Sequence, residues 1–144
     1  MSSTATDLDA TTIRVRVTQL QDEFFGRVDR AESAADLLTE DAEFRGAHGR
    51  EAVAELLLSL AKKRADTGRT SRHFSSNVTI EDLGEGRYRV RSLVVVLSLN
   101  TQPESAGELV AGDHDDIVVF DADGVCRFAK QGMAPALKLG LTAL

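Results

Sequence analysis

Apolar residues recur at every third or fourth position in residues 13–28. Because an α-helix completes a turn in about 3.6 residues, residues with this spacing lie along one face of a helix. We therefore predict an amphipathic helix here, with an apolar face formed by Ile13, Val17, Leu20, Phe24 and Val28. Phe25 stands beside this face and could reach round it.

A second long helix is predicted for residues 49–64, which are rich in Ala, Leu and Glu. Its apolar face would carry Val53, Leu56, Leu57 and Leu60. Between the two helices, residues 33–38 predict a short helical segment. The alternation in residues 41–45, bounded by glycines, predicts a short strand and a turn.

From residue 72 onward the pattern is that of strands separated by turns. The predicted strands cover residues 72–83, 87–100, 109–120 and 125–133, with a longer loop at 101–107. Apolar and β-branched residues dominate the strands, and glycine-containing turns connect them. This order of elements favours one α+β domain in which N-terminal helices pack on a curved, mainly antiparallel sheet.

We place this single domain at residues 12–134. Residues 1–11 are expected to form a flexible polar tail. Residues 135–144 form an apolar C-terminal tail, which we expect to pack over a cavity mouth or against another subunit because so much apolar surface is unfavourable in water.

The chain of 144 residues suits one domain, and its 42% hydrophobic and 28% charged residues are ordinary for a globular protein. No apolar run approaches the roughly 20 residues needed to cross a bilayer, so we expect no membrane partner. The polar N-terminal stretch lacks the features of a secretory signal, and we expect a cytoplasmic location.

The net charge of −6 argues against a nucleic-acid partner, whose phosphates would be repelled. The single cysteine, Cys126, excludes an internal disulfide and a cysteine-based metal cluster. A local exception to the negative charge is a basic stretch that contains Lys62, Lys63, Arg64, Arg69 and Arg72. It could meet an anion, but our preferred interpretation is a basic helix end that complements the helix dipole.

Two histidines could carry chemistry. His73 lies near the start of a predicted strand, where a ring that titrates near neutral pH would be held rigidly. His114 is surrounded by Asp113, Asp115 and Asp116, but strand alternation lets at most two of these four side chains converge. For this second group we favour an exposed, carboxylate-rich edge over a metal site or an acid–base cluster.

Five short phrases, in their order and spacing, resemble a known superfamily. They are VDR at 28–30, LLTEDAEF at 37–44, GREAV at 49–53, RHFSSN at 72–77 and DGVCRF at 123–128. They resemble the SnoaL-like branch of the nuclear-transport-factor-like superfamily, which includes ketosteroid isomerase, scytalone dehydratase and hexachlorocyclohexane dehydrochlorinase. The resemblance implies a cone-shaped fold that encloses a pocket, and dimerisation through the sheet.

The resemblance also implies candidate catalytic residues. In the dehydratase and dehydrochlorinase members, an aspartate near the end of the first helix orients a histidine on the sheet, and the histidine removes a proton from a carbon. Asp29 and His73 occupy the matching positions of the motifs. The chain departs from the scytalone dehydratase type, because residues 87–100 contain no second histidine and Tyr88 is the only tyrosine.

Other residues are candidates for substrate binding or for the core. For substrate binding we select Phe25, Asn77, Arg91, His114 and Phe128. Asn77 and Arg91 would contribute only if their strand faces point inward. In every interpretation we expect the core to contain Phe24, Phe25, Phe44, Phe74, Val94, Val96 and Phe128. Some of these could also line a pocket, since small-molecule sites are mostly apolar.

Three functions are compatible with the sequence, which does not identify a substrate. The first is a cofactor-free, dehydratase-like lyase or isomerase that acts on a small hydrophobic molecule, with Asp29 orienting His73 as general base and no metal. The second is a SnoaL-like polyketide cyclase in which an acidic residue transfers the proton. The third is a non-catalytic binding or structural subunit, because RHFSSN is also similar to the small subunits of aromatic-ring-hydroxylating dioxygenases. The resemblance favours a homodimer.

Overall fold

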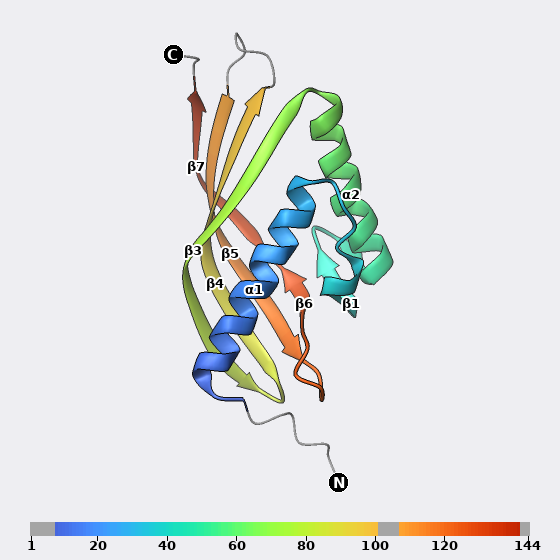
Figure 1. Cartoon of the computed structure of the whole chain (residues 1–144), viewed down its shortest axis with the longest axis vertical. Helices are drawn as coiled ribbons and strands as arrows, with labels where there is room; N and C mark the ends of the chain where they lie inside the picture. Colours follow the sequence, from blue (N-terminus) through green and yellow to red (C-terminus); the bar gives the residue numbers. More distant parts are fainter. Residues whose placement is uncertain (1–7, 101–106, 142–144) are drawn as a thin grey trace.

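Two helices lie on one face of a long, curved sheet (Figure 1). The computed structural model describes residues 8–100 and 107–141. Helix α1 spans Ala10–Asp29 and helix α2 spans Arg50–Asp66. Within these described ranges, neither helix combines the length and the apolar character needed to cross a membrane.

Helix α1 begins where a side chain caps it. The Asp9 carboxylate accepts a hydrogen bond from the backbone N–H of Thr12 at 2.7 Å, which satisfies one of the free donors of the first turn. All five residues of the predicted apolar face are buried, as is Phe25. Residues 10 and 11, which we expected in the N-terminal tail, are therefore helical, and residues 1–7 of that tail lie outside the described residues.

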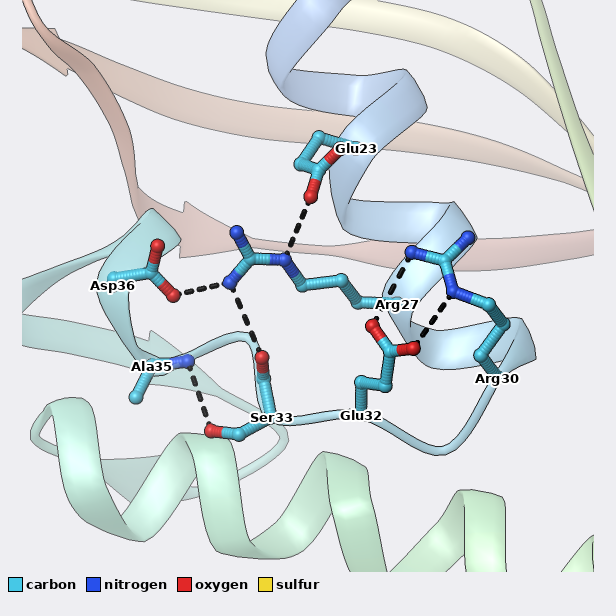
Figure 2. Close-up of polar contacts among 7 residues, drawn as sticks. All are labelled: Glu23, Arg27, Arg30, Glu32, Ser33, Ala35 and Asp36. Carbon is cyan, nitrogen blue, oxygen red and sulfur yellow. Dashed lines mark hydrogen bonds and ion pairs between the residues drawn. The ribbon is translucent and has the colours of Figure 1, made fainter.

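The C-terminal end of α1 is held by a network of arginines and carboxylates (Figure 2). Arg27 pairs with Glu23 one turn back at 2.9 Å, and it also bonds Asp36 and the carbonyl of Ser33 in the following segment. The next arginine, Arg30, pairs with Glu32 at 2.9 Å. Because these bonds join the helix to the chain that follows it, they fix the position of its last turn.

The strands form one sheet. They are β1 Leu38–Phe44, β2 Ala47–His48, β3 Arg69–Gly84, β4 Arg87–Asn100, β5 Gly107–Phe120, β6 Cys126–Gln131 and β7 Met133–Leu141. The strand order is β2-β1-β6-β5-β4-β3, with β7 also paired to β5. Only the β1–β6 pair among these is parallel, so the α+β prediction with a mainly antiparallel sheet is confirmed.

Two segments differ from the sequence-based expectation. The helical segment expected at residues 33–38 is a single 3₁₀ turn, Ala35–Leu37, because Leu38 already pairs with Phe128 of β6. The apolar tail expected at 135–144 is strand β7 as far as Leu141, with Leu137 opposite Ala111 of β5. A strand satisfies the backbone donors and acceptors of this segment, which a loose tail would leave to water. Residues 142–144 lie outside the described part.

The core lies between α1 and the inner face of the sheet. Phe24 on the helix meets Phe128 on β6 edge to face, with the ring centroids 5.2 Å apart. Val94 is also buried, while Phe44 and Val96 are half-buried. The prediction for Phe74 is wrong, because this side chain is 56% exposed. It follows His73 in β3, and strand alternation sends the two side chains to opposite faces.

Candidate active site

Asp29 and His73 form a close pair. Asp29 is the last residue of α1, and His73 lies on the part of β3 that faces this helix end. The His73 Nδ1 atom lies 2.5 Å from Asp29 Oδ1, and the His73 backbone N–H donates to Oδ2 at 3.0 Å. A carboxylate can only accept hydrogen bonds, so Nδ1 carries the hydrogen and the lone pair of the neutral ring is on Nε2.

Both members of the pair are shielded from water, with side chains that are 10% and 9% exposed for His73 and Asp29. Phe25 lies parallel to the His73 ring at 8°, with a centroid separation of 5.1 Å. Phe25 also meets the His114 ring nearly at a right angle, with an interplanar angle of 79° and centroids 5.9 Å apart. This stacking and the two bonds to Asp29 hold the imidazole in one orientation.

A cavity of about 580 Å³ opens beside the pair. His73 and His114 both line it, and so does Phe25. Its apolar walls come from both helices and the sheet: Phe24, Phe25, Val28, Phe44, Leu57, Leu60, Val96, Val110 and Met133. The cavity explains why Leu57 and Leu60 on the apolar face of α2 are only half-buried. Its size and apolar lining suit a small hydrophobic molecule.

His114 and Asp116 form a second buried pair, which corrects our preferred interpretation of this segment. The two residues are neighbours on the inner face of β5, whereas Asp113 and Asp115 are exposed on the other face, as alternation requires. His114 Nδ1 lies 3.8 Å from Asp116 Oδ2, and no described group hydrogen-bonds this nitrogen. Asp116 also accepts the backbone N–H of Gly132 at 3.1 Å.

Burial raises the pKa of the Asp116 carboxyl, although His114 and the Gly132 N–H oppose the rise. A carboxyl whose pKa is higher in the folded state binds more protons when folded, so it makes the folded state less stable as pH rises. We therefore expect the stability of the Asp116→Asn variant, relative to the wild type, to increase from about pH 4 to about pH 7. The measurement is urea unfolding across this range.

The neighbouring Asp115 provides a control of opposite sign. Its pair with Arg89, at 2.8 Å and 2.5 Å, holds the pKa of the Asp115 carboxyl below its usual range. The stability of Asp115→Asn relative to the wild type should therefore decrease as pH rises to about pH 5, and it should stay level above that pH because the carboxyl is then ionised in both states. Parallel pH dependences for the two variants would contradict this account of the buried pair.

Three predicted substrate-binding residues do not line the cavity. Asn77 is exposed in a bulge of β3, where its φ of 55° suits the left-handed conformation that asparagine tolerates. Arg91 is exposed on the outer face of β4, with Asp115 at 3.9 Å. Phe128 is only 1% exposed, because the core packing against Phe24 occupies it completely.

The basic stretch includes a basic helix end, as in our preferred interpretation, because Lys63 and Arg64 lie in the last turn of α2. Some of its side chains also line the cavity. Lys63, Arg64 and Arg69 line the cavity, together with Arg45, which the sequence did not single out. Lys62 and Arg72 are exposed and do not line it. In the described residues, no three His, Cys, Asp or Glu side chains are grouped so that they could hold a metal ion.

No protein-family model matches this sequence, and no curated protein matches it either. Solved structures do resemble it. A protein described as a candidate scytalone dehydratase from Novosphingobium aromaticivorans is 23% identical, with a TM-score of 0.73 and 91% of each chain covered. A hexachlorocyclohexane dehydrochlorinase (LinA, type 2) is 20% identical, with a TM-score of 0.76 over 96% of this chain and 95% of the other.

ActVI-ORFA from Streptomyces coelicolor is also similar, with 20% identity and a TM-score of 0.73 over 85% of this chain and 97% of the other. These matches span nearly the whole length of each protein. The chain therefore has the cone-like fold that these solved structures share, which confirms the fold implied by the resemblance of the sequence phrases.

Proposed function

We propose that this protein is a cofactor-free lyase or isomerase that removes a proton from carbon in a small hydrophobic molecule. The observation that carries the proposal is the Asp29–His73 pair at the wall of an apolar cavity. The names of two similar structures, a dehydratase and a dehydrochlorinase, support the same class of chemistry. His73 is the general base and Asp29 orients it.

The geometry suits this assignment of roles. The bond to Asp29 leaves Nε2 of His73 as the basic atom, and no described residue hydrogen-bonds it. When the ring takes up a proton it becomes an imidazolium, which the adjacent carboxylate stabilises. The His73 side chain is only 10% exposed and lies among apolar residues of the wall, so a bound apolar substrate would shield Nε2 from water.

His114 supplies a second polar group to the same cavity, and its ring, like that of His73, contacts Phe25. An imidazole at this place can donate a hydrogen bond to a substrate oxygen or halogen as the neighbouring C–H bond breaks. We assign it to substrate binding, which retains the role that the sequence gave it. Phe25 contacts the substrate and both imidazoles.

A generic probe tests the proposal without knowledge of the natural substrate. Nitrobenzisoxazole is an apolar aromatic molecule from which a base removes one C–H proton. As the proton is removed, the electron pair of the C–H bond forms the nitrile and the N–O bond of the ring breaks, which gives a single coloured cyanonitrophenolate. The wild-type protein should catalyse this elimination with saturation by the probe, because the cavity binds it beside Nε2. A rate equal to that of free imidazole at the same concentration would overturn the proposal.

The alternative of a cyclase, in which a carboxylate transfers the proton, predicts a different ranking of variants. With His73 as base, Asp29→Asn should lower kcat on the order of 10- to 100-fold, because the ring loses its fixed tautomer but keeps its nitrogen. His73→Asn should lower it further. Kinetics on both variants, with the exposed Asp22→Asn as matched control, decides the point, and a larger loss for Asp29→Asn favours the cyclase.

We further propose that the protein is a homodimer that associates through the outer face of the sheet. Directly paired residues of adjacent strands point to the same side. Such pairing places Phe74, Val95, Ala111 and Leu137 in one row across β3, β4, β5 and β7. The adjacent row contains Leu97, Leu109 and Leu139. An apolar face of this kind, with Phe74 and Leu137 more than half exposed, suits a partner surface.

A further inference from the structure

Four cationic side chains gather on the wall of the cavity. Arg45 follows β1, Lys63 and Arg64 lie in the last turn of α2, and Arg69 begins β3. Three separate segments therefore contribute cations to the lining of one cavity. Among the described lining residues, Glu108 is the only one with a carboxylate side chain, so the cations outnumber the anions. The cavity is therefore apolar in its walls and positively charged in one region.

Glu108 neutralises only part of this charge. It lies 4.0 Å from Arg69 and 3.6 Å from Lys138, so it is shared between two cations. The guanidinium of Arg45 lies over the ring of Phe44, 5.1 Å from its centroid, in a cation–π contact that attracts the positive charge but does not neutralise it. Within the described part of the chain, neither Lys63 nor Arg64 makes an ion pair.

Arg64 is the most unusual of the four. It is half-buried, and this burial lowers the pKa of its guanidinium while the charge of Arg45 acts in the same direction. Asp29 is near enough to favour the charged form but too far to pair with it. A guanidinium that is partly removed from water without a carboxylate partner is unfavourable. An anionic group that enters the cavity would supply the missing partner.

We propose that the cavity binds amphipathic anions: the substrate is an apolar molecule that carries a carboxylate, and Arg64, with Lys63 and Arg45, binds this carboxylate. The planar fork of a guanidinium matches a carboxylate through two parallel hydrogen bonds. The apolar skeleton then lies against Phe25 and Leu57, with His73 within the same cavity. This inference rests on the proposed function only in taking the cavity as the substrate site.

The test compares two ligands that differ only in charge, naphthalene carboxylate and its neutral primary amide, by isothermal titration calorimetry at low salt. The wild type should bind the carboxylate about tenfold more tightly than the amide, as one charged hydrogen-bonded contact predicts. Arg64→Met should remove most of this preference and leave the affinity for the amide nearly unchanged. Arg64→Lys should keep part of the preference, because the charge remains without the fork.

Lys62→Met is the matched control. Lys62 lies two residues before Arg64 on the same helix, is exposed and does not line the cavity, so the substitution removes a nearby charge without changing the cavity wall. It should leave the affinities for both ligands as in the wild type. Equal affinities of the wild type for carboxylate and amide, or an unchanged preference in Arg64→Met, would overturn the inference. Circular dichroism establishes that each variant is folded.

This outcome is independent of the test of the base. The affinity ratio depends on the charges at the cavity wall, whereas elimination of nitrobenzisoxazole depends on His73. A charge preference without elimination would contradict the lyase or isomerase and leave the anion site standing. Elimination without a charge preference would contradict the anion site and support the lyase or isomerase.

Discussion

Replacement of His73 by alanine should lower the rate of nitrobenzisoxazole elimination by about 10²- to 10⁴-fold while the protein remains folded. The loss follows because the substitution removes the imidazole that lines the cavity. In the wild type, the bond from Nδ1 to Asp29 leaves the Nε2 lone pair of this ring free to act as the base. The substitution keeps the backbone N–H of residue 73, which donates to Asp29 Oδ2 at 3.0 Å, so the shielded carboxylate retains a hydrogen-bond partner. Steady-state kinetics together with circular dichroism measures both effects.

Two further variants make this result specific. His48 is exposed on β2 and does not line the cavity, so His48→Ala should retain the wild-type rate. His73→Gln keeps most of the side-chain volume and should be as slow as His73→Ala, since neither side chain is a base. Wild-type turnover by a folded His73→Ala protein would show that the pair is structural.

Replacement of Phe74 by glutamate should convert the dimer to a monomer. Burial of a phenylalanine side chain contributes about 1.5–3 kcal/mol, and a two-fold dimer buries the residue twice. We therefore expect the dissociation constant of the dimer to rise by about 10²-fold or more, because the glutamate also brings a charge to an apolar interface. Sedimentation equilibrium over a range of protein concentrations measures this change.

Val15 provides the matched control for Phe74. It is 48% exposed on α1, away from the outer face of the sheet, so Val15→Glu adds the same charge at a similarly exposed apolar position. This variant should associate like the wild type. A wild-type protein that is monomeric at all concentrations, or a Phe74→Glu variant that dimerises as tightly, would contradict association through this face.

The sequence predicted those parts of the fold that depend on local patterns. The period of the apolar face identified α1, and the strands β3 to β5 follow from their β-branched residues and turns. The parallel pairing of β1 with β6 has no local signal, because it depends on how the whole sheet closes. Strand β7 was missed for a related reason, since it pairs with β5 residues that lie 19 to 34 positions earlier in the chain, with β6 in between.

The part of the candidate site that lies in two recognisable sequence phrases was predictable. The part that depends on which way a strand or a helix end faces was not. Asp29 and His73 lie together as the resemblance implied. For His114 and Asp116, alternation correctly limited the pair to two residues, but it does not say which face of β5 points inward. The same uncertainty about strand faces explains Arg91, which points outward. The role of Arg64 depends on where α2 ends relative to the cavity, which helix periodicity does not reveal.

The most direct test of the central claim is the nitrogen NMR spectrum of protein labelled in histidine, at a pH where neutral imidazoles predominate. The account predicts that His73 is in the tautomer with hydrogen on Nδ1, and that Asp29→Asn disturbs this preference. The loss of one signal in His73→Gln assigns the resonance. A His73 ring with its hydrogen on Nε2, or a mixture of tautomers like that of free histidine, would contradict the claim that Asp29 prepares this ring as a base.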